Sequence, residues 1–200
     1  MTFRKEIKFR VSNSDMKIYK EMLLKDGMIS IYPKRNVYSC YFDTHDLKLF
    51  FASEEGILPR KKIRYRWYEC ENIVFKEIKI SSIEGRYKKS HKIDCNNLLN
   101  LKNEYLRDNF YGRLYPKIIV TYERDYFFYK NLRLTIDNNI KYKDLTGIFK
   151  KEVRDFENVI EIKTSLSTST DYLEEIFQTQ PSRFSKYSRG ILHLKKHLRF

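Results

Sequence analysis

Arg64 and Arg66 lie two positions apart in a segment of alternating polar and apolar residues, which predicts a β-strand. Their side chains should leave one face of that strand about 7 Å from each other. Guanidinium groups at this spacing can grip successive phosphate groups of a phosphate chain through paired hydrogen bonds. The alternative is a pair of cross-strand ion pairs, with Glu77 or Glu161 as the partner. The pattern alone leaves both interpretations open.

Glu161 is a carboxylate that could bind a divalent cation. It lies between apolar residues in the segment VIEIK, which predicts a strand with Glu161 and Lys163 on one face. A carboxylate supplies the hard oxygen ligand that such a cation prefers. An ion pair with a neighbouring basic side chain is again the alternative. The four histidines have no metal-binding spacing, and no Ser/His/Asp or Cys/His arrangement indicates nucleophilic catalysis by the protein.

The same alternation recurs along five segments, each with an apolar face and an ionic face. A sheet with one solvated face is the ordinary explanation, but ionic faces so rich in cations would repel themselves. An antiparallel barrel whose lumen holds a phosphate chain and a divalent cation, with helices over its apolar outer face, explains both faces. The ionic residues are Arg4, Glu6, Lys8, Arg10, Lys62, Arg64, Arg66, Glu77, Lys79, Arg133, Asp137, Glu161 and Lys163.

Composition sets the class of protein. The 200 residues fit one domain, and 40 basic against 26 acidic residues give a net charge of +14 that attracts polyanions. With 42% hydrophobic residues and one alanine, Ala52, the chain should be folded and rich in strands, with helices over residues 14–26, 96–107 and 169–178.

No apolar run of signal-peptide or transmembrane length occurs, and three cysteines give no disulfide framework, so we expect a cytoplasmic protein. P-loop and Rossmann glycine patterns are absent as well.

Eight short strings occur in an order that resembles a known family. They are EIK at 6–8, YFDT at 41–44, RYRWY at 64–68, EIK at 77–79, YER at 122–124, LTID at 134–137, IEIK at 160–163 and FSKY at 184–187. Together they resemble the VTC domain, the catalytic module of polyphosphate polymerases in the triphosphate tunnel metalloenzyme (CYTH-like) superfamily. The resemblance implies a single domain over residues 1–200 and an α+β fold. In that fold, an eight-stranded antiparallel β-barrel forms a tunnel with a basic lumen, and helices pack outside it.

The resemblance also implies roles for individual residues. Glu161 would hold Mn²⁺ or Mg²⁺. The expected catalytic residues are Lys8, Arg64, Arg66, Lys79, Arg124 and Lys186. The expected substrate-binding residues are Glu6, Lys62, Arg133, Lys163 and Tyr187. Two aspartates stay outside both sets, because Asp43 could bond turn amides and Asp137 could hold metal or pair with Arg133.

The first strand bears on the reaction. Triphosphatases of the CYTH type carry ExExK there, whereas this chain has Arg4 in place of the first glutamate, which favours phosphoryl transfer between phosphate chains. The sequence therefore predicts a polyphosphate polymerase that moves the γ-phosphate of ATP, or another nucleoside triphosphate, onto inorganic polyphosphate. The alternatives are an inorganic or nucleoside triphosphatase of the same fold, and a non-catalytic polyanion-binding module. Sequence-specific nucleic acid is not expected, since no RNP1 string occurs; a separate membrane partner stays open.

Overall fold

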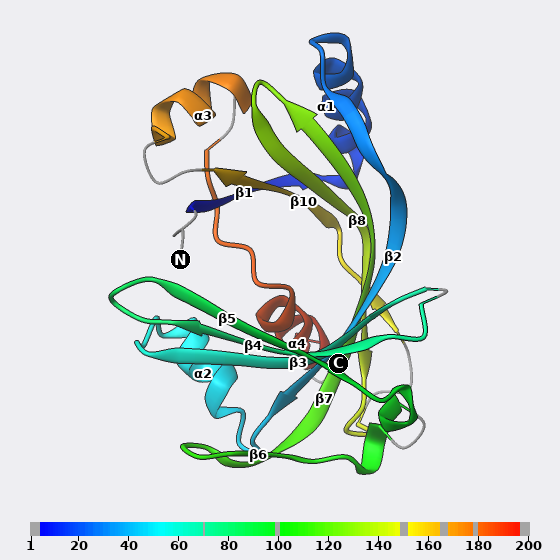
Figure 1. Ribbon diagram of the computed structural model, residues 1–200, viewed down its shortest axis with the longest axis vertical. Coiled ribbons are helices and arrows are strands. Elements are labelled where there is room, and N and C mark those ends of the chain that lie inside the picture. Colours follow the sequence, from blue (N-terminus) through cyan, green and yellow to red (C-terminus); the bar gives the residue numbers. More distant parts are fainter. Residues whose placement is uncertain are drawn as a thin grey trace. The chain divides into compact units, whose positions relative to one another are not determined.

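The computed structural model describes residues 5–69, 71–98, 101–148, 152–164, 168–177 and 180–196 (Figure 1). Arg4, Cys70 and Gln178 lie outside these residues. The strands are β1 (Lys5–Ser12), β2 (Ile29–Asp43), β3 (Arg60–Tyr68), β4 (Val74–Ser81), β5 (Arg86–Ile93), β6 (Leu106–Asp108), β7 (Gly112–Tyr129), β8 (Leu132–Asp144), β9 (Val153–Arg154) and β10 (Glu157–Thr164). The α-helices are α1 (Asn13–Lys25), α2 (Lys48–Glu54), α3 (Thr170–Phe177) and α4 (Lys186–Lys196).

The strands form an antiparallel sheet, so the predicted α+β class is confirmed. Eight of them are hydrogen-bonded in the order β1-β10-β8-β7-β2-β3-β4-β5, while β6 pairs with β7 and β9 with β8. The predicted closed barrel needs a correction, because no ladder joins β1 to β5 in the described ranges. The sequence of β5 gives a physical reason, since its exposed basic side chains disfavour pairing with a further strand: Arg86, Lys88, Lys89 and Lys92.

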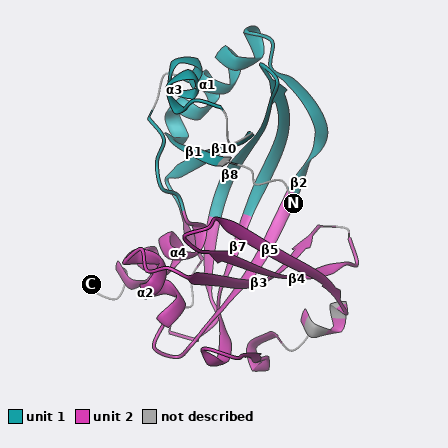
Figure 2. Cartoon of the chain, turned by 60° about the vertical axis from the view of Figure 1, so that its left-hand side comes forward, with its two compact units in different colours: residues 1–35, 122–140, 155–184 teal, residues 36–121, 141–154, 185–200 magenta. Residues whose placement is uncertain are grey.

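The chain forms two compact units, coloured separately in Figure 2. Unit 1 comprises residues 1–35, 122–140 and 155–184, and unit 2 comprises residues 36–121, 141–154 and 185–200. Strands β2, β7 and β8 contribute residues to both. The single domain over residues 1–200 stays a prediction.

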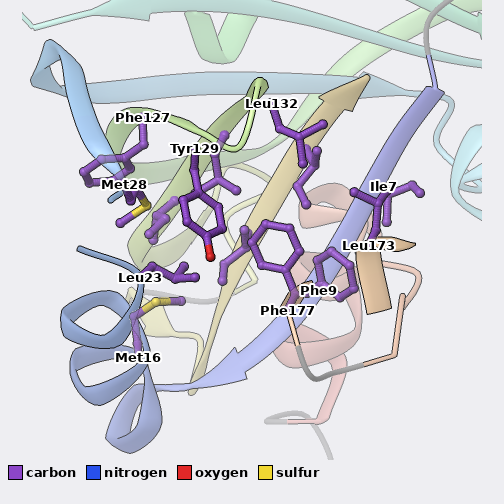
Figure 3. Close-up of a cluster of buried hydrophobic side chains, with 14 residues drawn as sticks. Ile7, Phe9, Met16, Leu23, Met28, Phe127, Tyr129, Leu132, Leu173 and Phe177 are labelled. Carbon is purple, nitrogen blue, oxygen red and sulfur yellow. The ribbon is translucent and has the colours of Figure 1, made fainter. Parts of the chain in front are cut away.

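Unit 1 buries the apolar faces of β1, β10 and β8 under α1 and α3 (Figure 3). The antiparallel register places Ile7 beside Ile162, and Ile162 beside Leu134, so alternate residues of adjacent strands point into one core. Phe177 of α3 stacks on Phe9 with the ring centroids 5.2 Å apart. The opposite faces of these strands must therefore carry the ionic residues, as the alternation predicts.

Two of the three predicted helices are confirmed within a residue or two of their predicted ends. Helix α1 starts where Ser12 accepts a hydrogen bond from the Asp15 amide, as expected for an N-cap, and α3 covers most of residues 169–178. The helix predicted at 96–107 is wrong. Two 3₁₀ turns, Cys95–Leu98 and Leu101–Asn103, lead instead into β6, because Leu106 pairs with Leu114 and packs into the core of unit 2.

Unit 2 contains two helices that the sequence analysis missed. Asp43 anchors the short helix α2, since its carboxylate accepts the amides of Leu49 and Phe50, each at 2.9 Å. Helix α4 contains Gly190, which argues against a helix when the sequence is read alone. None of the described helices has the length and apolar character needed to cross a membrane.

Gly190 gives a test of the packing in unit 2. A Cβ at this position would lie 2.6 Å from Ile118 Cδ1 and 2.7 Å from Tyr142 Cδ1, too close for undisturbed packing. Overpacking of this kind costs about 1–3 kcal/mol, which should exceed the roughly 1 kcal/mol that alanine gains over glycine in a helix. We therefore expect Gly190→Ala to lower the urea midpoint, whereas Leu192→Ala, at a more exposed site of α4, should change it little. An unchanged or raised midpoint for Gly190→Ala would contradict this packing.

Candidate functional site

The ionic face of unit 1 brings Lys8, Glu161 and Lys163 together. Lys8 lies directly opposite Glu161 in the register of β1 and β10, and Glu6 lies opposite Lys163. The Nζ atoms of Lys8 and Lys163 are 3.7 and 3.9 Å from the Glu161 carboxylate, while Lys8 donates a hydrogen bond to the Phe184 carbonyl at 3.0 Å. Glu161 is buried, so two ammonium groups face one shielded carboxylate at ion-pair distances longer than a hydrogen bond.

A second ion pair in unit 1 holds Arg124. Its Nε and a terminal guanidinium nitrogen donate to the two carboxylate oxygens of Asp137 at 2.5 and 2.7 Å. Burial alone would lower the pKa of Arg124, but the Asp137 charge outweighs burial and keeps this pKa well above its usual value. Asp137 therefore pairs with Arg124 rather than with Arg133, which lies opposite Lys163 in the register of β8 and β10. A two-bond pair of this kind fixes the plane of the guanidinium group.

The residues of unit 1 fit a metal ion that arrives already bound to phosphate. Among the described residues, no three His, Cys, Asp or Glu side chains gather around a common point. Thr135 lies directly opposite Glu161, and its Oγ1 is shielded from solvent with no hydrogen-bond partner in the described chain. One carboxylate, phosphate oxygens and water commonly complete a Mg²⁺ site in phosphoryl-transfer enzymes. The donor set around Glu161 suits that arrangement, and it does not suit a cage built from protein alone.

In unit 2, Arg64 and Arg66 gather around a buried carboxylate. The register places Arg64 opposite both Tyr41 on β2 and Glu77 on β4. One Glu77 oxygen accepts two hydrogen bonds from Arg64, at 2.7 and 2.5 Å, and lies 3.7 Å from Arg66, while Lys88 donates to the other oxygen. Three cations thus surround one carboxylate, and the two arginines are only 8% exposed.

The electrostatics of Glu77 follow from these neighbours. Burial alone would raise its pKa, but the charges of Arg64 and Arg66 and the hydrogen bond from Lys88 hold the pKa far below the ordinary value. Glu77 is therefore ionised throughout the physiological range. Among the described ion pairs of Glu77, one negative charge faces three positive charges, so positive charge is in excess beside two buried arginines, where it acts strongly on an anion.

A pair of stacked tyrosines lies beside this cluster. Arg64 donates to the Tyr41 hydroxyl at 2.7 Å, and the Tyr41 ring stacks on Tyr187 with the centroids 5.1 Å apart. The Tyr187 hydroxyl donates to Asp43 at 2.6 Å. Burial raises the pKa of Asp43 even though these hydrogen bonds lower it. Asp43 therefore accepts backbone amides, which is one of the roles expected from the sequence, and its hydrogen bond to the Tyr187 hydroxyl also fixes that tyrosine.

The remaining predicted residues of unit 2 lie around the same strands. Lys62 donates to Ser185 Oγ at 2.7 Å, and Lys79 lies opposite Lys62 on β3 and Lys88 on β5. Lys186 begins α4. The predicted residues therefore fall into two groups, one in each unit, and their convergence on one lumen stays a prediction.

Sequence reasoning missed three residues of these groups: Tyr41, Lys88 and Thr135. Thr135 could have been found, because it alternates with Arg133 and Asp137 on the ionic face. Lys88 lies in the mostly polar segment RYKKSHKI, where no alternation of apolar residues marks one face of a strand. Tyr41 is part of an apolar run, where a tyrosine is ordinarily a core residue.

The match to a family model decides the family. The model of the VTC domain matches residues 3–195. The chain belongs to the VTC domain family. This confirms the resemblance seen in the eight sequence strings, and it covers both units. A comparison with curated proteins found no match.

Solved structures of similar fold come from bacteria, archaea and plants. A candidate adenylate cyclase from Bacillus halodurans superposes with a TM-score of 0.59 at 14% identity, covering 92% of this VTC domain and 94% of that chain. HpAC1 from Hippeastrum, a candidate adenylyl cyclase described as having a dominant triphosphatase activity, gives 0.60 at 14% identity, covering 94% and 95%. The PH1819 protein from Pyrococcus horikoshii gives 0.55 at 17% identity, covering 97% and 99%. At these identities the likeness establishes the shared fold.

Glu77 provides a test of the cluster in unit 2. Glu77→Gln leaves two buried arginines without their counter-charge, which should cost about 3 kcal/mol of unfolding free energy at pH 7. The folded-state pKa of Glu77 is depressed, so its stabilisation is present above its ordinary pKa of 4.5 and is lost as the pH falls toward the folded-state value. The stability difference between wild type and variant should therefore be constant from pH 6 to 8 and shrink below about pH 4.

Urea titrations at several pH values measure this difference. Glu84→Gln is the matched control, because Glu84 is fully exposed in the turn between β4 and β5. A Glu77→Gln protein as stable as the Glu84→Gln control at pH 7 would contradict the claim that Glu77 stabilises the two buried arginines.

Proposed function

We propose that this VTC domain is a polyphosphate polymerase, which transfers the γ-phosphate of ATP or another nucleoside triphosphate onto a growing inorganic polyphosphate chain. The observation that carries the proposal is the excess of positive charge around the buried Glu77, where the buried Arg64 and Arg66 and the partly exposed Lys88 share one carboxylate. Two buried arginines in such an excess favour a multiply charged anion. Membership of the VTC domain family gives independent support for a triphosphate-acting enzyme.

In the proposed reaction, a terminal oxygen of the polyphosphate chain forms a bond to the γ-phosphorus. The bond between that phosphorus and the β–γ bridging oxygen breaks, and the nucleoside diphosphate leaves with the electron pair. The attacking oxygen is already anionic at neutral pH, so no general base is needed. Charge spreads over the oxygens of the transferred group, and catalysis therefore depends on positioned cations.

The cations have separate proposed tasks. Arg64, Arg66, Lys79 and Arg124 neutralise the charge on the transferred phosphoryl group. The ion pairs of Arg64 with Glu77 and of Arg124 with Asp137 hold two of these guanidinium groups in place beforehand, so little reorganisation is needed during the reaction. The product chain is held by Lys8, Arg133, Lys163 and Lys186.

Mn²⁺ or Mg²⁺, when bound, would supply Lewis-acid neutralisation of phosphate oxygens. Glu161 would hold it, with Thr135 as the adjacent hydroxyl. Lys8 and Lys163 limit the negative charge at this carboxylate, which fits an ion that brings its own phosphate ligands.

A triphosphatase of the same fold is the second candidate. HpAC1, whose fold is similar, is described as having a dominant triphosphatase activity. Both candidates need Glu161 and the arginines. They differ in product, since water as acceptor yields orthophosphate and a phosphate chain as acceptor yields longer chains.

The deciding experiment is to incubate the purified protein with ATP and Mn²⁺ or Mg²⁺, with and without a short polyphosphate primer, and to resolve the products by length on a gel. The polymerase proposal predicts a ladder of chains that lengthens with time. Formation of orthophosphate without longer chains would show that the protein is a triphosphatase and not a polymerase. No consumption of nucleotide under any of these conditions would leave a non-catalytic polyanion-binding module as the better account.

Two substitutions should separate catalysis from binding. Glu161→Gln removes a charged metal ligand at nearly constant size, so turnover should fall at least about a hundredfold while ATP affinity changes much less. Arg66→Ala removes a cation that contacts both ground state and transition state, so affinity and rate should both fall, with binding weakened by about 2 kcal/mol. Calorimetry gives the affinities, and chain synthesis gives the rates.

The matched controls lie on the same strands as Glu161 and Lys8. Glu157→Gln changes a carboxylate of β10 that pairs with Arg10, and Arg10→Ala removes a cation of β1 whose side chain is 44% exposed. Both controls should retain activity. Unchanged chain synthesis by Glu161→Gln would refute the assignment of Glu161 as a metal ligand. If Arg10→Ala weakened binding and rate as much as Arg66→Ala does, the total positive charge, and not the position of Arg66, would explain the effect.

A further inference from the structure

Tyr41 holds a fixed place beside the arginines of unit 2. Its strand partner is Arg64, so the two side chains leave the same face of the sheet next to each other. The tyrosine is only 6% exposed. Its ring is fixed on one side by stacking on Tyr187 and lies 5.6 Å from the Arg64 guanidinium carbon. The hydroxyl therefore cannot turn away toward solvent without breaking these contacts.

The hydrogen bonds of the two stacked tyrosines are unequal. A phenol can donate one proton and can also accept hydrogen bonds. Tyr187 donates its proton to Asp43. The Tyr41 hydroxyl accepts from Arg64 at 2.7 Å, and since guanidinium groups only donate, this bond leaves the proton of Tyr41 uncommitted. Within the described residues, no side chain or carbonyl accepts it.

The surroundings of Tyr41 show what kind of acceptor would fit. The charged groups that act on its hydroxyl are Arg64 and Arg66 from β3 and Lys186 from α4, and all three are donors. Burial alone would raise the pKa of Tyr41, but these positive charges lower it below the ordinary value, which makes the phenol a better hydrogen-bond donor. A buried donor without an acceptor is unfavourable. An anionic oxygen would accept the proton and also be attracted by the neighbouring cations.

We propose that the Tyr41 hydroxyl donates a hydrogen bond to a phosphate oxygen of the triphosphate or polyphosphate substrate. This makes Tyr41 a substrate-binding residue that works with Arg64, and the inference rests on the proposed function. Tyr187 and Asp43 act through Tyr41, because the stacked ring of Tyr187, held by its bond to Asp43, sets the position of the Tyr41 ring.

Tyr41→Phe isolates the hydroxyl from the ring. The variant keeps the stacking on Tyr187 and the contact of the ring with Arg64. It should bind inorganic tripolyphosphate about tenfold or more weakly near pH 7.5, as expected for one hydrogen bond to a charged group. Tyr65→Phe is the matched control, since Tyr65 is an equally buried tyrosine on β3 that packs edge-on against Phe42 in the apolar core. Isothermal titration calorimetry without nucleotide gives each affinity.

The pH dependence separates a donor role from a structural one. The donor proton is lost as the pH rises through the lowered pKa of Tyr41, and a phenolate would repel phosphate. The affinity ratio of wild type to Tyr41→Phe should therefore fall to one or below as the pH approaches 10. Lys186, Tyr187 and Asp43 are present in both proteins. Their own titration therefore affects the pH dependence of tripolyphosphate affinity in both, and it cancels in the ratio. A purely structural role predicts a ratio that does not change with pH.

A second measurement keeps the inference testable if Tyr41→Phe folds poorly. With 3-fluorotyrosine at position 41, ¹⁹F NMR reports the pKa of this phenol directly, and tripolyphosphate should raise it because the bound anion favours the protonated form. An unchanged pKa on saturation would overturn the inference. So would a Tyr41→Phe protein that binds tripolyphosphate as tightly as wild type, and in that case chain synthesis by the wild type would leave the proposed function standing. A wild type that neither binds tripolyphosphate nor consumes nucleotide would overturn both.

Discussion

The buried carboxylate of Glu77 is the constraint on which the ionic cluster of unit 2 depends. Two arginines and a lysine would repel each other on one sheet face, and burial would add the cost of desolvation. Glu77 offsets part of that repulsion through direct hydrogen bonds from Arg64 and Lys88. It offsets only part of it, because one negative charge faces three positive ones. The remainder is what an anionic ligand would neutralise.

Unit 1 uses carboxylates in two different ways. Asp137 is fully buried and binds Arg124 through two hydrogen bonds, so its charge is committed to positioning that arginine. The ammonium groups of Lys8 and Lys163 lie at longer ion-pair distances from Glu161, and Thr135 on the adjacent strand has a buried hydroxyl with no hydrogen-bond partner among the described residues. The first carboxylate fixes a cation in place, whereas the second is the one that we propose as a metal ligand.

The faces of the strands could be predicted from the sequence because alternation fixes which side each residue takes. Arg64 and Glu161 are therefore where the pattern put them, as are the apolar partners Ile7 and Ile162. Strand partners depend on register, which a single sequence does not give. The pairing of Asp137 with Arg124, two residues on different strands, could not be read from the sequence for this reason. Helix α4 was missed because its glycine is required by packing against Ile118 and Tyr142, contacts distant in the chain.

A crystal structure of the protein with tripolyphosphate is the most direct test of the proposal that the clustered arginines of unit 2 bind a phosphate chain. We predict phosphate oxygens within hydrogen-bond distance of the guanidinium groups of Arg64 and Arg66 and of the Tyr41 hydroxyl, with Glu77 still bound to Arg64. Tripolyphosphate bound only to exposed lysines such as Lys89 and Lys92 of β5, with the arginine cluster unchanged and without ligand, would contradict this proposal.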